Sequence, residues 1–581
     1  MRNSHSIRYT TSPLLASKTP AWRSKFIVAL ILLGFVLLVG RAFYVQVLGN
    51  NFFRHQGEIR FARTLELPAS RGRILDRNGR ILASSISAAG VWAIPEDVAL
   101  DKPATREKLG QLAKLLGMPI TELSAKVSVE DKNFVWIKHQ LDWDIGKQVS
   151  ALNIPGIYIK KEYKREYPEG DSAAHLVGFT NGDDLGQEGI ELAFNKDLAG
   201  QPGSRRVIRD RLGNAVEDIG DEVPPVDGRD LTLSIDERVQ AVAYQRLRDA
   251  VLTNKARAGS VVVVDAHTGE LLAMANYPSF DPNNRHSLTG EQLRNRAMTD
   301  VFEPGSTMKP ITVATALQLG RITPQTIIDT NPGRINVTGM TVHDDENFGV
   351  LTVEGVIQKS SNVGATKISQ RMSAQEMWNS FTAVGFGQKP QTVFPGAVTG
   401  RLRPWKSWRP IEQATMSYGY GISASLFQIA HAYTSFAHNG EVIPITLLKT
   451  EEAPAGVQVF SPQVAAQVRH MMQLAASPGG TAPLAQTEGY SVGGKTGTAH
   501  KQVGKGYAAD KYRAWYTGMS PINAPSIIVA VMVDEPSAGK YFGGLVAAPV
   551  FSQVVQQTLR ILNVPPDLEV SPQIKTAASK G

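Results

Sequence analysis

EPGSTMKP, at residues 303–310, is the stretch from which the architecture of this 581-residue chain can be inferred. Ser306 and Lys309 lie one helical turn apart, so in a helix they share a face, where the lysine amine can act as base for the serine. Ser360-Ser361-Asn362 and then Lys495-Thr496-Gly497 follow in that order. An S-x-x-K, an S-x-N and a K-T-G in this order predict an acyl-transfer site.

A second serine–lysine pair, Ser537 and Lys540, has the same spacing, and the local sequence separates the two. Ser306 follows Pro-Gly and precedes the apolar run ITVATALQLG, which places it at the start of a helix, where backbone N–H groups point toward a developing anion. Ser537 follows Glu-Pro and runs into a glycine-containing loop. We therefore predict Ser306 as the nucleophile and Ser537 as a turn residue.

Residues 489–496 (GYSVGGKT) also satisfy the phosphate-loop pattern G-x-x-x-x-G-K-[ST]. A phosphate loop needs an apolar strand before it and a helix that begins at the lysine. Polar SPGGTAPLAQTE precedes this stretch, and no apolar periodicity follows Gly497. The sequence thus favours Lys495 as a member of the catalytic set. The S-x-N serines have a second interpretation, as caps of a helix predicted over 363–372, and capping is compatible with catalysis.

A basic leader and an apolar run precede all of these motifs. Residues 1–25 carry Lys and Arg but no Asp or Glu, and residues 26–47 are predominantly apolar. At about 1.5 Å per residue such a helix is about 33 Å long and can cross a bilayer. No small-x-small cleavage site follows, so we predict a signal anchor, with the basic N-terminus in the cytoplasm and the remainder outside.

Composition excludes several other functional classes. The net charge is +8, but the leader contributes most of it, so it does not indicate nucleic-acid binding. Cysteine is absent, which excludes disulfides and thiolate metal sites, and the 11 histidines form no metal motif. We predict no cofactor, no metal and no nucleic-acid partner.

Patterning beyond the anchor predicts two folded regions. In residues 48–227, RGRILDRNGRIL (71–82) predicts a hairpin with its turn at Asn78-Gly79, and a glycine-rich, then amphipathic stretch covers 175–203. From spacing alone, both are more often structural than functional. Residues 228–563 predict one α+β domain, from a strand and helix over 231–251, two strands over 260–275, a strand over 527–535 and a helix over 546–562. Residues 564–581 predict a flexible tail.

Together these blocks resemble the class B penicillin-binding proteins, and within them the septal transpeptidases. The resemblance implies an α+β fold with a single N-terminal transmembrane helix, an elongated non-catalytic pedestal of the dimerisation type at 48–227, and a transpeptidase domain at 228–563. That domain is expected to be an antiparallel sheet flanked by helices, as in serine β-lactamases. The blocks that carry the resemblance are EPGSTMKP, SSNVG (360–364), SYGYGIS (417–423), GGKTGTA (493–499), YFGGLVAAPVF (541–551) and RGRILDRNGR (71–80).

The resemblance also implies what each site residue does. Ser306 attacks the penultimate D-alanine carbonyl of a peptidoglycan stem peptide, and Lys309, with a pKa lowered by confinement near other cations, accepts its proton. Ser360 passes the proton to the leaving amine, and Asn362 binds the donor amide. Backbone N–H groups of Ser306 and Thr498 form the oxyanion hole. Lys495 completes the catalytic set, and the expected substrate-binding residues are Thr496, Gly497, Thr498, Tyr512, Tyr541 and Phe542.

The same resemblance implies a single-pass inner-membrane protein with a periplasmic catalytic domain. The expected partners are stem peptides ending in D-Ala-D-Ala, β-lactam antibiotics, an FtsW-type membrane glycosyltransferase and other division proteins. A D,D-carboxypeptidase, a serine β-lactamase and a penicillin sensor of the same fold stay open, because they differ only in whether water or an amine resolves the acyl-enzyme. A non-catalytic division scaffold also stays open. The anchor and pedestal favour the transpeptidase.

Overall fold

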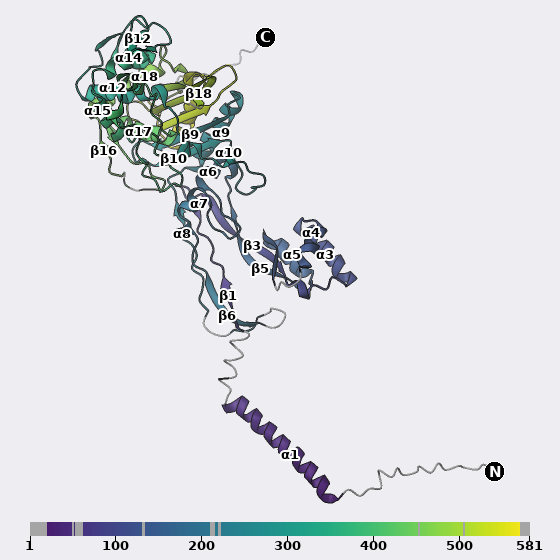
Figure 1. Cartoon of the computed structure of the whole chain (residues 1–581). Coiled ribbons are helices and arrows are strands. Elements are labelled where there is room, and N and C mark those ends of the chain that lie inside the picture. Colours follow the sequence, from purple (N-terminus) through teal and green to yellow (C-terminus); the bar gives the residue numbers. More distant parts are fainter. Residues whose placement is uncertain are drawn as a thin grey trace, which may run out of the picture. The chain divides into compact units, whose positions relative to one another are not determined.

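The structure is a computed structural model that describes residues 20–48, 52, 62–129, 134–209, 215–218, 222–450, 452, 454–503 and 506–569 (Figure 1). Most of the predicted basic leader and of the predicted C-terminal tail lies outside these residues. The chain divides by contacts into two compact units. One is Met1–Leu67 with Pro202–Pro225, and the other is Pro68–Gln201 with Val226–Gly581.

The first unit contains a long apolar helix and a small sheet. α1 (Ala21–Phe43) continues into the π-helical turn η1 (Tyr44–Leu48), and among the described residues this is the one helix long and apolar enough to cross a membrane. None of its residues is buried. The helix begins ahead of the predicted span 26–47. The sheet has the order β1 (Ala62–Leu67), β6 (Gly203–Arg209), β7 (Ala215–Asp218), all antiparallel.

In the second unit, residues 68–201 form a sheet covered by helices. β3 (Ile81–Ala93) lies between β4 (Val135–Asp142) and β5 (Ile157–Glu166), and β2 (Ile74–Leu75) pairs with both β3 and β8 (Leu231–Thr232). The predicted hairpin over 71–82 is confirmed, and positive φ falls on Gly79 alone within its turn. One face of the sheet packs against the helices α3 (Pro103–Leu116), α4 (Ile120–Val127) and α5 (Trp143–Ala151).

A buried ion-pair cluster joins the two stretches that the sequence marked in this region. Arg71 and Arg165 each place Nε on a different oxygen of Glu191, at 2.6 and 2.7 Å. All three side chains are at most 2% exposed. Arg71 also donates to Asn195 Oδ1 and to the carbonyl of Asp184. We call Arg71, Arg165 and Glu191 the pedestal cluster; its contacts support the structural interpretation of 71–82 and 175–203.

The predicted α+β architecture is confirmed in the remaining part of this unit. Its antiparallel sheet has the order β10 (Leu271–Tyr277), β9 (Ala258–Asp265), β19 (Ile527–Asp534), β18 (Gly506–Ser520), β17 (Gly493–Val503). α9 (Glu237–Thr253) and α20 (Ala548–Ile561) pack on one face, and α17 (Leu426–Ala437) and α18 (Pro462–Ala476) on the other. Alternate residues of β9 enter opposite cores, Val261 and Val263 in one and Val262 and Val264 in the other. Burial on both faces explains why this part of β9 is an unbroken run of valines.

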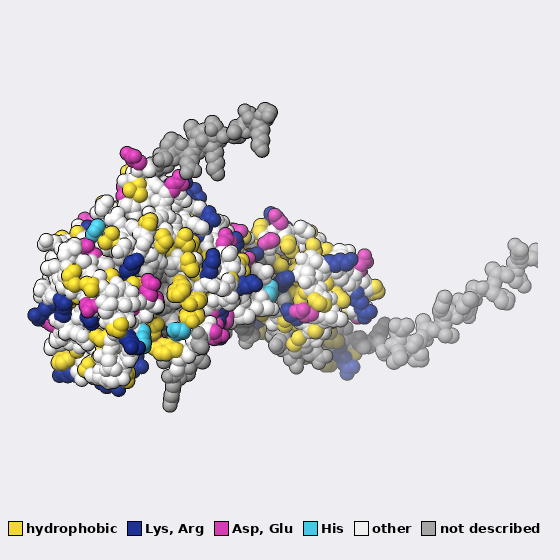
Figure 2. Space-filling view, turned by 90° about the horizontal axis from the view of Figure 1, so that it is seen from above, with side chains coloured by type: hydrophobic (Ala, Val, Ile, Leu, Met, Phe, Trp, Pro, Cys, Tyr) yellow, Lys and Arg dark blue, Asp and Glu magenta, His cyan; other side chains and the backbone are white. Residues whose placement is uncertain are grey.

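Residues on both sides of the predicted boundary at residue 227 pack against each other. Ile74, Leu176 and Ile190 belong to the same hydrophobic core as Val262 and Met308, so residues 68–201 and the large sheet pack as one body. Asp76, in the hairpin turn, also accepts a hydrogen bond from the backbone N–H of Glu237 at the start of α9. On the face shown in Figure 2, basic and acidic side chains are interspersed and form no basic stripe.

Candidate active site

Ser306 lies in a tight turn that leads into a buried helix. The 3₁₀ turn η4 (Gly305–Met308) carries Ser306, and Lys309 is the first residue of α12 (Lys309–Gln318). The predicted helix start is therefore confirmed, with the serine one turn ahead of the α-helix. Thr307 fixes the turn, because its hydroxyl donates to the Pro304 carbonyl and its carbonyl accepts from Tyr433, both at 2.8 Å.

Glycine backbones press against this turn from two sides. A Cβ on Gly419 would lie 2.0 Å from the Gly305 carbonyl oxygen, and a Cβ on Gly497 would lie 2.9 Å from the Pro304 carbonyl oxygen. Both positions therefore have to be glycine for the chain segments to approach this closely. Gly497 does not line the pocket that is described below. Its role in the structure is to let β17 lie beside the nucleophile.

Lys309 connects the first two motifs. Its Nζ lies 2.8 Å from Ser306 Oγ, 2.6 Å from the Ser360 carbonyl oxygen, 3.1 Å from Ser360 Oγ and 2.8 Å from Asn362 Oδ1. The Asn362 amide is oriented by its Nδ2, which donates to the His343 carbonyl. Serine, lysine, serine and asparagine thus converge on one amine, as the motif spacing predicted.

Burial sets the protonation state of this amine. Lys309 is fully buried, which lowers its pKa from 10.5 to about 7, although the charges of Asp344 and Asp345 act in the opposite direction. The confinement near another cation that the sequence led us to expect is present, because the charges of Lys309 and Lys495 repel each other, but burial is the largest cause of the low pKa. A neutral amine has two N–H donors and one lone pair. The Ser360 carbonyl and Asn362 Oδ1 can only accept, so the lone pair is left for a hydroxyl, and Ser306 Oγ is at hydrogen-bonding distance.

A left-handed residue joins two helices at the S-x-N motif. Ser360 (φ 61°) ends α13 (Val353–Lys359), and this turn brings both its carbonyl and its hydroxyl to Lys309. Such a conformation is uncommon for residues other than glycine and is concentrated at functional sites. Ser361, not Ser360, caps α14 (Asn362–Ser369), with its Oγ accepting from the N–H of Gly364. The structure thus separates the two roles that the sequence left together.

Asp344 holds the start of α14 in place. Its carboxylate accepts from the Ser361 hydroxyl at 2.6 Å and from the backbone N–H groups of Asn362 and Val363 at 2.5 and 2.9 Å. It follows a small hairpin, β12 (Arg334–Val337) and β13 (Met340–His343). The sequence analysis missed this residue, because no pattern shows that the hairpin returns to the S-x-N turn.

β17 forms the other wall of the site. Lys495 is fully buried, and burial and the charge of Lys309 together hold its pKa well below the usual range. Its Nζ donates to the hydroxyl of Thr496, which in turn contacts the hydroxyl of Thr481 at 2.9 Å. The Thr498 hydroxyl accepts from the N–H of Gly543 at 3.1 Å. A strand, not a helix, contains Lys495, so the structure also excludes a phosphate loop.

The three predicted aromatic residues stack in a row beside this strand. Tyr512 and Tyr541 are stacked with ring centroids 4.1 Å apart, and Tyr541 and Phe542 are tilted at 4.5 Å. His500 extends the row, 4.5 Å from Tyr512. The Gly543 contact with Thr498 ties the end of the row to β17.

One pocket of about 500 Å³ collects most of the predicted site. The predicted residues that line it are Ser306, Ser360, Asn362, Thr496, Thr498, Tyr512, Tyr541 and Phe542. Lys309 and Lys495 lie buried next to these residues and contact them. The lining residues that sequence analysis did not single out are Asp345, Lys359, Tyr420, Thr481, His500, Gly543, Gly544 and Leu545. Four of them, Tyr420, Gly543, Gly544 and Leu545, lie within the sequence blocks 417–423 and 541–551 that carry the family resemblance. Membership in these blocks could have identified them as site residues.

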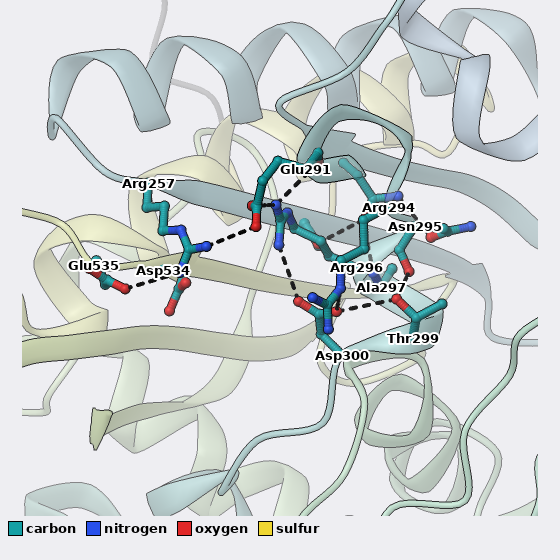
Figure 3. A network of polar contacts seen from close by, with 12 residues as sticks. Arg257, Glu291, Arg294, Asn295, Arg296, Ala297, Thr299, Asp300, Asp534 and Glu535 are labelled. Carbon is teal, nitrogen blue, oxygen red and sulfur yellow. Dashed lines mark hydrogen bonds and ion pairs between the residues drawn. The ribbon is translucent and has the colours of Figure 1, made fainter. Parts of the chain in front are cut away.

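A polar network fixes the segment that enters the Ser306 turn (Figure 3). The buried Arg296 contacts Asp300 and Glu291, and Arg257 links Glu291 to Glu535 at the end of β19. Asp300 also pairs with Arg294. The segment is therefore held at several points only a few residues before Ser306.

The second serine–lysine pair has no such setting. Ser537 lies in an irregular segment after β19, and its hydroxyl donates to the Lys255 carbonyl at 2.7 Å. Ser537 thus begins no helix that would align it with Lys540, as expected from the sequence.

Comparisons with known proteins agree with this geometry. A family model described as penicillin binding protein transpeptidase domain matches residues 259–556, and one described as penicillin-binding protein dimerisation domain matches residues 66–233. The transpeptidase domain of Burkholderia pseudomallei penicillin-binding protein 3 is 54% identical, with a TM-score of 0.54, and the match covers 58% of this chain and 98% of that one. A peptidoglycan synthetase from Bifidobacterium adolescentis, 24% identical, has a TM-score of 0.70 over 88% of this chain and 98% of that one, which shows the shared fold.

Full-length relatives extend the match. The probable peptidoglycan D,D-transpeptidase PenA of Neisseria gonorrhoeae is 42% identical over 546 residues, covering 94% of this chain and 93% of that protein. Peptidoglycan D,D-transpeptidase FtsI of Escherichia coli K12 is 39% identical over 549 residues, again covering 94% and 93%. At this identity and coverage the resemblance inferred from the motifs is confirmed: the chain belongs to the class B penicillin-binding proteins, a family of serine-type peptidoglycan D,D-transpeptidases.

Proposed function

We propose that this protein cross-links peptidoglycan stem peptides at the division septum and that β-lactams inactivate it by acylating Ser306. The observation that carries the proposal is the convergence of Ser306, Ser360 and Asn362 on the buried amine of Lys309, whose pKa is lowered to about 7. A lone pair directed at the serine hydroxyl is what a general base needs. The septal assignment rests on the similarity to FtsI.

The reaction begins with acylation. Ser306 Oγ attacks the penultimate D-alanine carbonyl while Lys309 takes its proton, and the terminal D-alanine leaves after protonation through Ser360. The backbone N–H groups of Ser306 and Thr498 stabilise the oxyanion, at about 10²–10³ in rate per donor. The second N–H of the Asn362 amide, beyond the one bonded to His343, is available for a donor carbonyl. An amine of a second stem peptide then takes the acyl group.

β17 is the proposed carboxylate site. Thr496 and Thr498 offer hydroxyls to the terminal carboxylate, and Lys495 lies directly behind Thr496. Because burial keeps the pKa of Lys495 low in the empty site, an arriving carboxylate supplies the missing counter-charge and raises that pKa. Substrate binding is therefore coupled to proton uptake by this lysine. Tyr512, Tyr541 and Phe542 form the aromatic wall against which the substrate packs.

The long helix of the first unit supports membrane anchoring. α1 and η1 are apolar and unburied, and the basic leader before them favours an N-terminus in the cytoplasm and a catalytic domain in the periplasm. We propose residues 48–227 as the pedestal and 228–563 as the transpeptidase domain. An FtsW-type glycosyltransferase and other division proteins are the proposed partners, by similarity to FtsI.

A labelling experiment tests the central claim. The detergent-solubilised full chain is incubated with a fluorescent penicillin, and the modified residue is mapped by mass spectrometry. We expect a label on Ser306 that persists for many minutes and is lost in Ser306→Ala, whereas Ser537→Ala keeps it. Rapid release of the label would identify a β-lactamase, and label at another residue would overturn the proposal. Normal septation by cells that carry only the Ser306→Ala protein would identify a scaffold.

A further inference from the structure

Asp345 is a carboxylate in the catalytic pocket that the reaction described above does not use. It lines the pocket together with Ser306, Ser360 and Asn362, and it is exposed. The carboxylate of its neighbour Asp344 is already occupied by hydrogen bonds from the start of α14. For Asp345, in contrast, the described part of the chain provides no hydrogen bond or ion pair.

Asp345 and β17 favour ligand groups of opposite charge. Thr496, Thr498 and Lys495 form the wall proposed to hold a carboxylate, whereas Asp345 lies on the S-x-N side of the same pocket. Its charge raises the pKa of both Lys309 and Lys495, so it lies within electrostatic range of the reaction centre. An exposed carboxylate there attracts a cation and repels an anion that enters the pocket.

The other charged groups of the pocket do not neutralise it. Lys359 also lines the pocket, but its Nζ donates to the Gly479 carbonyl at 3.0 Å and forms no ion pair with Asp345. Burial keeps the pKa of Lys309 and Lys495 low. His500 belongs to the aromatic row on the other wall.

We propose that Asp345 binds an ammonium group of a stem peptide at the rim of the catalytic pocket, and so acts as a positioning and specificity-determining residue. The proposal rests on the proposed transpeptidation, in which the substrates carry amines. The ammonium belongs either to the third residue of the donor stem or to the acceptor. Asp345 contributes no covalent step.

Penicillins that differ only in side-chain charge test the electrostatic claim. Ampicillin carries an ammonium, benzylpenicillin no side-chain charge and carbenicillin a carboxylate, and the rate constant for acylation of Ser306 is measured with each. Asp345→Asn should lower the ampicillin-to-carbenicillin rate ratio by about two- to fivefold, the size expected for a contact between exposed charges. Benzylpenicillin should still acylate the variant, and its rate should change by a factor that lies between those for ampicillin and carbenicillin, because all three share the ring carboxylate and differ in side-chain charge.

Two controls keep this result specific. Glu346→Gln removes the adjacent exposed carboxylate, which does not line the pocket, and should leave the ratio unchanged. The measurements are made at pH 6, where the ampicillin amine is an ammonium, since an α-amino group has a pKa of about 7.7–8.0. The loss of Asp345 lowers the pKa of Lys309 further, and the rate ratio cancels this change because it affects every penicillin alike. An unchanged ratio in Asp345→Asn, or an equal change in Glu346→Gln, would overturn the proposal. Loss of benzylpenicillin acylation in the wild type would instead refute the proposed function.

Peptide substrates then identify the source of the ammonium. Donors ending in D-Ala-D-Ala are prepared with a free or an acetylated third-residue amine, and the acylation rate is measured in a single turnover. If the donor is the source, Asp345→Asn slows only the free-amine donor. If the acceptor is the source, the variant lowers the ratio of aminolysis to hydrolysis of the acyl-enzyme. An effect in neither arm would overturn the proposal even if the penicillin ratio changes.

Discussion

The pedestal cluster and the catalytic centre both bury two cations, and they treat them in opposite ways. Arg71 and Arg165 share the carboxylate of Glu191, so each buried charge has a partner within 2.7 Å. Lys309 and Lys495 are equally buried but contact hydroxyls, carbonyls and an amide. A paired charge stays charged and holds segments together, whereas an unpaired amine becomes neutral and can take a proton.

The comparison also shows that burial affects a guanidinium and an amine differently. An arginine keeps its charge at any pH that a protein tolerates, so it suits a permanent junction. A lysine loses its charge when it is buried, which brings its pKa into the range of a general base. The same burial thus produces a structural element in one place and a reactive group in the other.

Replacing Lys309, the proposed base, should have the largest effect of the substitutions that test this comparison. Lys309→Met is expected to reduce Ser306 acylation by about 10²–10⁴-fold, the usual contribution of a general base. It should also raise the free energy of unfolding by about 2 kcal/mol at pH 7. Lowering the lysine pKa from 10.5 to about 7 costs the folded state about 4 kcal/mol at this pH, and the hydrogen bonds lost with the amine offset about half of that gain. Penicillin labelling and denaturant unfolding measure the two effects. A variant that is both inactive and less stable would show that the amine is structural.

Replacing a paired cation should have the opposite effect on stability. Arg71→Met leaves Glu191 without one of its two partners and is expected to lower the free energy of unfolding by about 3–5 kcal/mol. The acylation rate of the protein that remains folded should stay within about twofold of wild type, because Arg71 lies outside the pocket. Arg73→Met, which removes an exposed ion pair with Asp230, is the matched control and should leave the free energy of unfolding almost unchanged.

The pH dependence of acylation should sharpen the comparison. Lys309 is neutral above a pKa of about 7 and protonated below it, so acylation by benzylpenicillin should fall about tenfold from pH 8 to pH 6. The pedestal arginines do not titrate in this range, so a milder variant such as Arg165→Lys should show the same midpoint. A flat profile between pH 6 and 8 would contradict the role of Lys309 as base.

The smallest predicted effect concerns the cap of α14. Ser361→Ala removes the hydrogen bond to the N–H of Gly364 and a donor to Asp344, and should lower stability by about 1 kcal/mol. Since this turn also carries Ser360 and Asn362, acylation should slow by a few-fold with no change in its pH midpoint. Thermal unfolding and labelling rates report both. A loss of activity as large as that of Lys309→Met would assign Ser361 a direct part in proton transfer.

Sequence patterns predicted what is local. The strands over 260–275 and 527–535, the helix over 546–562 and the hairpin over 71–82 follow from periodicity and turn residues, and all are present. The motif set predicted which residues meet at Lys309. The left-handed turn at Ser360, the carboxylates of Asp344 and Asp345, and burial as the cause of the low Lys309 pKa depend on distant segments that pack together, so no local pattern contains them.

The pedestal shows the same limit. The sequence marked 71–82 and 175–203 as structural, but it did not show that Arg71 and Glu191 pair, nor that residues 68–201 share a core with the large sheet. Pairing of buried charges is decided in three dimensions. The boundary at residue 227 was predicted from a linker-like local composition, and local composition does not show which distant residues share a core.

The glycine backbones at Gly419 and Gly497 limit how this protein can evolve. Even one methyl group at either position would meet a carbonyl oxygen of the segment that positions Ser306, so substitutions there damage turnover together with inhibitor binding. If β-lactams acylate Ser306 as proposed, heritable changes that weaken this acylation but spare cross-linking are expected at the rim of the pocket, where Asp345 and Phe542 are exposed. Substitutions selected by antibiotics are therefore expected at these exposed residues and not in the segments that pack around Ser306.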